Sequence, residues 1–260
     1  MVREVRRVEE GRVAVKADLH VHSYVSDGLP SPRDVVKYAA KVGLDVISIT
    51  DHNTFLGSVL ALRETSKVVV VLGAEFRTQY GDIVVLCESL PRGVRSVPGS
   101  AKTISLVSLV DLAERENCVL VAVHPYATFR HGSGSLFRAS FIDCVEVFNS
   151  SSDPITNVYT LAIVTDKPCK TAGSDSHLLE TLGSAYTLVD GSSPNREEVL
   201  EGLRRGKTTP RYSLVESLVD LVVLARKRLY HSLRLRLNLR DDMWSRVRRY
   251  NELLESLGST

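Results

Sequence analysis

The stretch ADLHVHSYVSDG, residues 17–28, leads from a β-branched run into a polar turn, and it governs the interpretation of the whole chain. The run over residues 13–19 predicts a strand, and Asp18, His20 and His22 alternate at its end. Alternate residues of an extended strand point to the same side, so both imidazoles can reach one ion. A His-x-His pair alone is weak evidence for a metal site, and the case depends on partners elsewhere in the sequence.

Short β-branched runs alternate with helical patterns over most of the chain. The clearest helix lies in SPRDVVKYAAKVG, where Ser31 suits the N-cap, Pro32 the first turn and Gly43 the C-cap. Further strands are expected at residues 46–50, 68–72, 83–86, 119–123, 145–148, 171–173 and 185–189, and further helices at 55–66, 103–116, 157–164 and 196–205. This order predicts an α/β fold with a mostly parallel sheet, either closed into a barrel or open and doubly wound.

Histidines and carboxylates recur where the predicted strands begin or end. Besides those of the first strand, these residues are Asp27, Asp51, His52, Glu75, Asp82, His124, Asp175 and His177. Both α/β arrangements gather functional residues at the strand ends, so we expect five of the seven histidines to converge on one rim. Taken singly, each residue could be a helix cap or a surface charge, but their shared position favours a metal site.

The donor types predict which ions bind. Imidazole and carboxylate without thiolate suit Zn²⁺, Mn²⁺ or Fe and exclude a closed, cysteine-rich structural zinc site. The candidates outnumber the ligands that one ion accepts, so two or three divalent ions are expected. Ions about 3.5 to 4 Å apart are a known device for clamping the attacking and leaving oxygens of a phosphoryl displacement.

Over residues 14–210 the chain resembles the PHP (polymerase and histidinol phosphatase) domain of metal-dependent phosphoesterases. The motifs that carry the resemblance are DLHVHSYVSDG, ITDHN, GAE, VHP and GSDSH, with the connectors VEVFN and LGSAYT. The resemblance implies a distorted (β/α)7 barrel with a trinuclear metal site on its rim.

The resemblance also implies which residues hold the ions. The expected ligand sets are His20, His22, Glu75 and Asp175 for one ion, Glu75 as a bridge and His124 for a second, and Asp27, His52 and His177 for a third. Relatives usually offer the second ion a further histidine after the glutamate, where YGDIVVL presents Asp82 instead. Asp18 and Asp51 are expected to orient ligating imidazoles.

The activity that the resemblance implies is hydrolysis of phosphate esters by a metal-activated hydroxide. The expected substrates are nucleotides, nucleoside 3′,5′-bisphosphates or the 5′ ends of short RNA. His22, Asp175 and Arg130 are expected to carry the reaction, and Arg130 and His131 of the loop HPYATFRHG are expected to bind the substrate phosphate. A solvent-exposed loop charge is the competing interpretation of Arg130.

Three other functions stay open at this stage. One is a histidinol-phosphate-type phosphatase of small molecules. Another is an amidohydrolase-type deacetylase, although such enzymes typically need a metal-bridging lysine where this chain has Glu75. The third is a non-catalytic RNA-binding scaffold, because residues 201–260 carry 13 Lys or Arg against 7 Asp or Glu. A solvated helix face is the ordinary alternative for such a basic stretch.

The bulk composition is that of a globular enzyme. Hydrophobic residues make up 43%, charged residues 25% and aromatic residues only 6%, which argues against an interface-dominated binding module. Residues 1–211 are expected to form the phosphoesterase domain, and residues 212–260 a helical extension whose leucines pack on the barrel or on a second subunit of a homo-oligomer. The four cysteines lack a Cys-x-x-Cys pair and are expected to be reduced core residues. With no signal peptide or membrane span apparent, a cytoplasmic protein without a membrane partner is expected.

Overall fold

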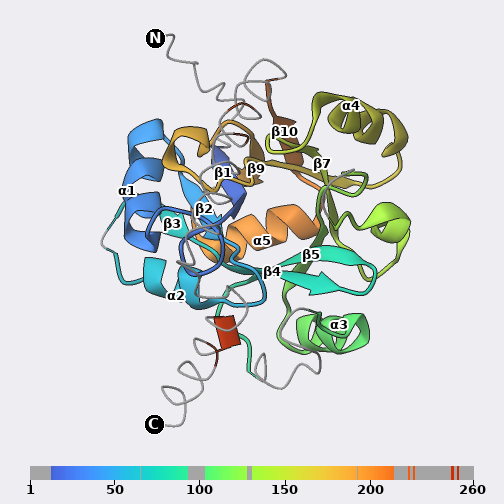
Figure 1. The fold of residues 1–260 in the computed structure, drawn as a ribbon, viewed down its shortest axis with the longest axis horizontal. Helices are drawn as coiled ribbons and strands as arrows, with labels where there is room; N and C mark the ends of the chain where they lie inside the picture. The colour runs from blue at the N-terminus through green and yellow to red at the C-terminus, as the bar shows by residue number, and fades with distance from the viewer. Residues whose placement is uncertain are drawn as a thin grey trace.

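The computed structural model describes residues 13–64, 66–92, 103–127, 131–191 and 193–213, together with residues 222, 225, 247, 248 and 251. The described strands form two five-stranded sheets (Figure 1). The first sheet has the order β10-β9-β1-β2-β3, with β1 Val13–Val21, β2 Val46–Ile49, β3 Val69–Val70, β9 Tyr186–Gly191 and β10 Thr208–Arg211. The second has the order β4-β5-β6-β7-β8, with β4 Leu72–Thr78, β5 Gly81–Cys87, β6 Val119–Ala122, β7 Cys144–Asn149 and β8 Cys169–Gly173.

The prediction of a mostly parallel sheet is wrong. Strands β1, β2 and β3 run parallel, as do β6, β7 and β8, but β9 pairs antiparallel with both β1 and β10, and β5 pairs antiparallel with both β4 and β6. The physical reason is clearest at β4 and β5. A tight turn between Thr78 and Gly81 joins them as a hairpin, and strands joined by so short a connection run antiparallel. Strand β10 was not expected at all.

The predicted (β/α)7 barrel is not confirmed, because the described strands form two sheets and no closed barrel is found among them. Isolated bridges between Val21 and Ser176 and between His52 and Glu75 join the two sheets. One apolar cluster also spans both, with Val15 of β1, Val121 of β6 and Leu203 of α5 among its buried members. The fold is therefore a mixed α/β structure in which two sheets share one core.

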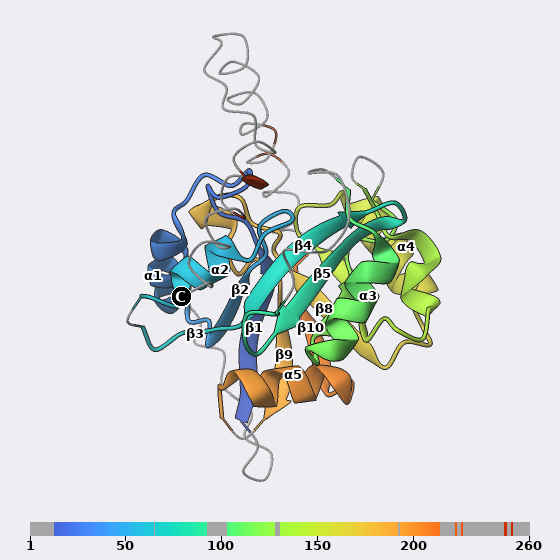
Figure 2. The same ribbon diagram turned by 90° about the horizontal axis from the view of Figure 1, so that it is seen from below.

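The helices lie near the predicted positions, and their ends follow from local sequence. They are α1 Pro32–Val42, α2 Leu56–Ala61, α3 Leu106–Arg115, α4 Pro154–Ile163 and α5 Arg196–Arg204, with short 3₁₀ helices η2 Gly134–Arg138 and η3 Leu179–Thr181. Helix α1 confirms its prediction, because the Ser31 side chain accepts a hydrogen bond from the Asp34 backbone and Gly43 ends the helix at φ 77°. In Figure 2, α1 and α2 flank one side, α3 and α4 the other, and α5 crosses the end where β1 begins.

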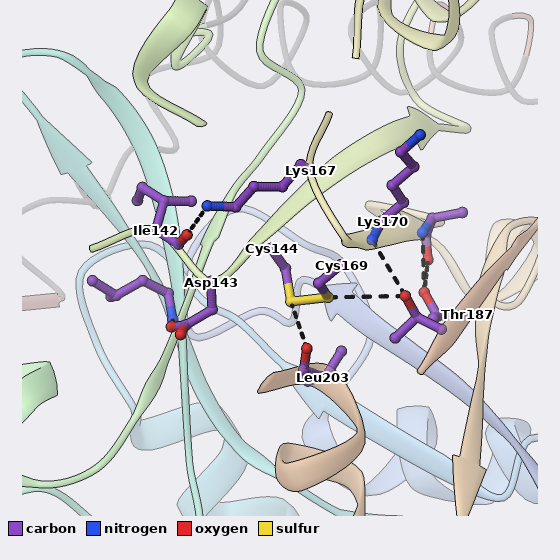
Figure 3. The surroundings of a disulfide bond; sticks show 11 residues. Ile142, Asp143, Cys144, Lys167, Cys169, Lys170, Thr187 and Leu203 are labelled. Atoms are coloured by element: carbon purple, nitrogen blue, oxygen red, sulfur yellow. Dashed lines mark hydrogen bonds between the residues drawn. A yellow bond between two sulfur atoms is a disulfide. The ribbon is translucent and has the colours of Figure 1, made fainter. Parts of the chain in front are cut away.

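The prediction of reduced cysteines is wrong, because the structure pairs them as Cys87–Cys118 and Cys144–Cys169. Cys144 and Cys169 lie opposite each other on parallel neighbours β7 and β8 (Figure 3). Cys87 ends β5, and Cys118 immediately precedes β6, its antiparallel neighbour. The Cα atoms of the pairs are 4.5 and 4.6 Å apart, which is disulfide distance. Sequence separations of 31 and 25 residues hide this proximity until the strand order is known.

Most of the expected extension at residues 212–260 lies outside the described residues. The domain boundary expected at residue 211 therefore stays a prediction. Tyr212, just past β10, stacks on Phe148 of β7 with ring centroids 4.2 Å apart. Among the helices that are described, none has both the length and the apolar character needed to cross a bilayer.

Candidate metal centre

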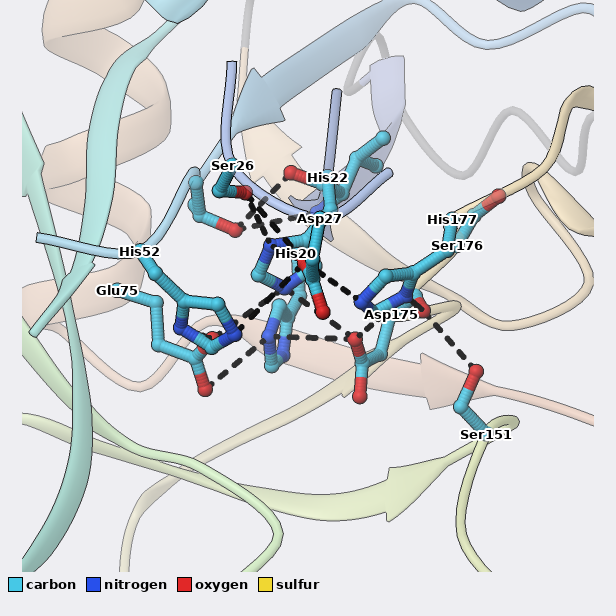
Figure 4. Close-up of polar contacts among 12 residues, drawn as sticks. His20, His22, Ser26, Asp27, His52, Glu75, Ser151, Asp175, Ser176 and His177 are labelled. Atoms are coloured by element: carbon cyan, nitrogen blue, oxygen red, sulfur yellow. Dashed lines mark hydrogen bonds and ion pairs between the residues drawn. The ribbon is translucent and has the colours of Figure 1, made fainter. Parts of the chain in front are cut away.

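The nine predicted ligands come together at one place, where strands of both sheets end. They are His20, His22, Asp27, His52, Glu75, Asp82, His124, Asp175 and His177, and they form five overlapping groups whose donor atoms lie within 4.8 Å of one another. Figure 4 labels all of them except Asp82 and His124. Seven of the nine are buried; Asp27 and His52 are partly exposed. The centre therefore has a closed interior and one side that faces solvent.

Glu75 of β4 lies in the middle of the centre and contacts four imidazoles. Its Oε2 is 3.3 Å from Nε2 of His22 and 3.0 Å from Nδ1 of His52. Its Oε1 is 3.0 Å from Nε2 of His124 and 3.6 Å from Nε2 of His20. Burial raises the pKa of Glu75, but the charges of His52 and His20 outweigh it and hold that pKa well below the ordinary value. Glu75 is thus an ionised carboxylate with both oxygens directed at ligand candidates, as a bridging ligand requires.

Two aspartates complete the donor set. Asp175 Oδ1 lies 3.3 Å from Nε2 of His22, 3.8 Å from Nε2 of His20 and 3.5 Å from Nδ1 of His177. Asp27, whose side chain is 37% exposed, places Oδ1 3.1 Å from Nε2 of His177. The same oxygen is 3.7 Å from Nδ1 of His22. Asp175 therefore belongs to the buried interior and Asp27 to the open side.

Backbone strain marks the loops that present these ligands. His124 follows β6 at φ 31° and Asp175 follows β8 at φ 49°, although neither residue is glycine. A left-handed conformation costs a residue with a side chain on the order of 1–3 kcal/mol, and such strain collects at functional sites. Two residues of the centre, His124 and Asp175, therefore have strained backbone conformations that the surrounding structure must stabilise.

Glu146 of β7 is a functional residue that the sequence analysis missed. Its Oε1 lies 3.0 Å from Nδ1 of His20, while its Oε2 accepts hydrogen bonds from the His124 backbone N–H at 3.0 Å and from Nδ2 of Asn149 at 2.9 Å. Asn149 Nδ2 also donates to Asp175 Oδ2 at 3.2 Å. Glu146 and Asn149 thereby position three ligand candidates. The available signal was a charged residue within the apolar run VEVF, which is unusual for a buried strand.

The charge state of His20 follows from these neighbours. Burial lowers the pKa of His20, but the charges of Glu146 and Glu75 raise it more, to about 10. Burial likewise raises the pKa of Glu146, and His20 more than offsets that effect, so the Glu146 pKa lies below its ordinary value. A hydrogen bond from Nδ1 to Glu146 leaves Nε2 as the atom that faces Glu75 and Asp175.

The donor atoms fit divalent cations. Nε2 of His20 and Nε2 of His22 are buried and make no hydrogen bond to the part of the chain that the structure describes. Buried polar atoms are normally hydrogen-bonded, and imidazole nitrogens beside ionised carboxylates form the donor set of Zn²⁺, Mn²⁺ or Fe sites. A bound cation would use these nitrogens as ligands and would balance the clustered negative charge.

The expectation that Asp18 and Asp51 orient imidazoles stays a prediction, and both carboxylates hydrogen-bond to loops that carry ligand candidates. Asp51 accepts hydrogen bonds from the backbone N–H and hydroxyl of Ser23 at 2.8 and 2.6 Å and from the hydroxyl of Ser26 at 2.6 Å. Asp18 accepts from the backbone N–H groups of Ser174 and Gly183 at 3.2 and 3.0 Å. Each carboxylate thus fixes a loop that carries ligands, because its oxygens are occupied by the polar groups of that loop.

Of the remaining predicted residues, the structure describes Asp82 and His131, and the Asp82 backbone N–H donates to the His131 carbonyl oxygen at 2.8 Å. The two carboxylate oxygens of Asp82 accept hydrogen bonds from Arg77 at 3.1 and 3.3 Å. Asp82 also belongs, with Glu75 and His124, to one of the five groups of potential metal ligands. His131, expected to bind substrate, uses Nε2 to contact the Thr78 carbonyl oxygen at 2.9 Å, which ties it to the β4–β5 turn. Arg130 lies outside the described residues.

Comparisons with known proteins agree with this arrangement. The family model of the PHP domain matches residues 18–135, and the PHP-associated model matches residues 158–208. An uncharacterized protein of Methanocaldococcus jannaschii, MJ1587, is 32% identical over 151 residues, which are 52% of this chain and 82% of that protein.

Two solved structures have the same fold. A two-domain protein of Bacteroides vulgatus, described as containing a predicted PHP-like metal-dependent phosphoesterase, has a TM-score of 0.64 at 18% identity, covering 85% of this chain and 74% of that one. Endonuclease Q, solved with a 27-mer duplex that has an abasic lesion at the active site, has a TM-score of 0.57 at 16% identity, covering 74% of this chain and 57% of that one. On the family models and the converging motifs, the chain belongs to the PHP domain family.

Proposed function

We propose that the chain is a metal-dependent phosphoesterase that hydrolyses phosphate esters of nucleotides, nucleoside 3′,5′-bisphosphates or the 5′ ends of short RNA. The observation that carries the proposal is the convergence of nine imidazole and carboxylate side chains, with donor atoms within 4.8 Å in each of five groups. Divalent ions held there would supply Lewis-acid charge and would lower the pKa of a nearby water molecule.

The buried residues of the centre would bind ions, and the partly exposed residues would face the substrate. His20, His22, Glu75 and Asp175 are buried, so they would hold ions in a site with little competing water. Asp27 and His52 lie at the partly exposed side, with Asp27 Oδ1 3.8 Å from His52 Nε2. A phosphate ester approaching from solvent reaches that side first. Preorganised charge in such a centre stabilises the negative charge that develops on phosphoryl oxygens.

A nucleic-acid or nucleotide substrate is supported by two observations. Endonuclease Q, which has the same fold, was solved with a 27-mer duplex substrate whose abasic lesion lies at the active site. The basic stretch at residues 201–260 would also attract a polyanion. A small phosphomonoester is the narrower alternative, because the open side of the centre also admits a single phosphate group.

The test is a substrate panel with purified, metal-loaded protein. The panel contains phosphomonoesters including histidinol phosphate, nucleoside 3′,5′-bisphosphates, 5′-labelled short RNA and a set of N-acetyl amides. The proposal expects release of phosphate or nucleotide, loss of that activity on chelation and its return with Mn²⁺, Zn²⁺ or Fe. Turnover of amides alone would point to a deacetylase. Salt-dependent RNA binding without any hydrolysis would point to a scaffold.

A further inference from the structure

Arg77 lies on the same side of β4 as the central glutamate. The two residues are separated by one position in an extended strand, so both side chains project toward the metal centre. In the β4–β5 hairpin Arg77 is directly opposite Asp82, and Glu75 is opposite Val84. Arg77 therefore lies two residue pairs beyond Glu75 along the hairpin, on the same face of the strand.

The contact with Asp82 fixes the guanidinium in one orientation. Nε of Arg77 is 3.1 Å from Oδ1 of Asp82, and Nη2 is 3.3 Å from Oδ2. The Asp82 side chain is 3% exposed and shares a group of donor atoms with Glu75 and His124. One carboxylate thus connects the guanidinium to the interior of the centre.

The Arg77 side chain is 33% exposed, so it lies at the boundary between the buried cluster and solvent. Burial lowers the pKa of Arg77, but Asp82, and at longer range Glu75 and Asp27, raise it above the ordinary value. Arg77 is therefore a permanent positive charge that interacts electrostatically with Asp27, a residue of the partly exposed side of the centre.

We propose that Arg77 binds the substrate phosphate at this centre, with its fixed guanidinium contacting non-bridging oxygens of the ester. The inference rests on the proposed phosphoesterase function. It gives Arg77 the phosphate-binding role that the sequence analysis expected of Arg130. A planar guanidinium matches the geometry of a phosphate, and it is more weakly hydrated than an ammonium. Because Asp82 already orders the side chain, little conformational entropy is lost when phosphate binds.

The experiment compares Arg77→Met and Arg77→Lys with the wild type and with Arg33→Met. Arg33 is the matched control, because its side chain is 63% exposed on α1 and pairs with Glu64. Metal content is measured by elemental analysis, the affinity of the metal-loaded protein for inorganic phosphate by calorimetry, and kcat and KM with a phosphomonoester that the wild type turns over.

Arg77→Met is expected to weaken phosphate binding and raise KM by roughly 10- to 100-fold, the range for losing a charge-assisted hydrogen bond. Arg77→Lys keeps the charge without the planar fork and is expected to fall between Arg77→Met and wild type. Metal content should stay at the wild-type level in all variants, and Arg33→Met should match wild type throughout. Should Arg77→Met not fold, the comparison of Arg77→Lys with Arg33→Met decides the question.

Phosphate affinity and KM within twofold of wild type in both Arg77 variants would overturn the proposal. Loss of metal from Arg77→Met would also overturn it, because Arg77 would then serve to position Asp82. If the wild type hydrolyses no phosphate ester but phosphate binding still falls in Arg77→Met, the assignment of Arg77 stands and the proposed function fails. The two failures are therefore distinguishable.

Discussion

Replacing Glu146 by glutamine should weaken metal binding without disturbing the fold. The Glu146 carboxylate oxygens form hydrogen bonds with Nδ1 of His20 at 3.0 Å, the backbone N–H of His124 at 3.0 Å and Nδ2 of Asn149 at 2.9 Å. A glutamine has one acceptor oxygen and one NH₂ group in their place. If the NH₂ group faces His124 and Asn149, three donors meet without an acceptor. If it faces His20, Nδ1 must become the acceptor and the proton moves to Nε2, the atom that would bind the ion.

With the glutamine amide in either orientation, the histidines that Glu146 positions are held less firmly. The loss of such a supporting carboxylate typically lowers metal affinity about 10- to 100-fold. That range corresponds to roughly 1.4 to 2.7 kcal/mol of binding free energy. The assay is calorimetric titration of the metal-free protein with Mn²⁺, with thermal unfolding of the metal-free form as the check on folding. Glu197→Gln is the control, because Glu197 is an exposed residue of α5. Wild-type Mn²⁺ affinity in Glu146→Gln would refute the assigned role of Glu146.

The other predictions test the ligands, their packing and the disulfides. Asp175→Asn should abolish turnover and lower metal content while circular dichroism stays unchanged, because one buried charged donor is lost. Gly173→Ala should lower Mn²⁺ affinity, since an added Cβ would lie 2.6 Å from Oε1 of Glu146 and 2.8 Å from Cβ of His20. Paired replacement of Cys87 and Cys118 by serine should lower the free energy of unfolding by roughly 3 to 4 kcal/mol, from the loop-closure entropy of a cross-link of that span.

Each of these three has an outcome that contradicts it. Full activity in Asp175→Asn would remove Asp175 from the centre. Gly191→Ala is the matched glycine control, because its added Cβ would meet nothing nearer than 3.3 Å, and equal metal affinity in the two variants would show that the packing at Gly173 is irrelevant. Free thiols detected in the denatured, unreduced protein would contradict the disulfides themselves.

The sequence predicted which histidines and carboxylates cluster, because their positions at strand ends follow from local rules. A polar residue directly after an apolar strand lies at the edge of the sheet in any α/β arrangement, so His52 and His124 were placed without knowing the strand order. Helix α1 was equally local, because Ser31 and Gly43 are its own caps. These features need only the residues within a few positions of one another.

The features that the sequence missed depend on contacts between distant residues. Glu146 meets His20 across 126 positions, so its role is apparent only once β7 lies near β1. The disulfides depend on which strands are neighbours. Arg77 and Asp82 are only 5 positions apart, but their contact depends on the hairpin that places them opposite each other. The hairpin itself lacked a strong turn motif, since its turn residues are Gln79 and Tyr80.

The central claim is that imidazoles and carboxylates from both sheets bind a cluster of divalent ions. Elemental analysis of purified wild-type protein and of Asp175→Asn, after dialysis against Mn²⁺ and removal of free metal, tests it most directly. The account predicts two or three ions per wild-type chain and at least one fewer in the variant. Less than one ion per wild-type chain, or the same content in both proteins, would contradict it.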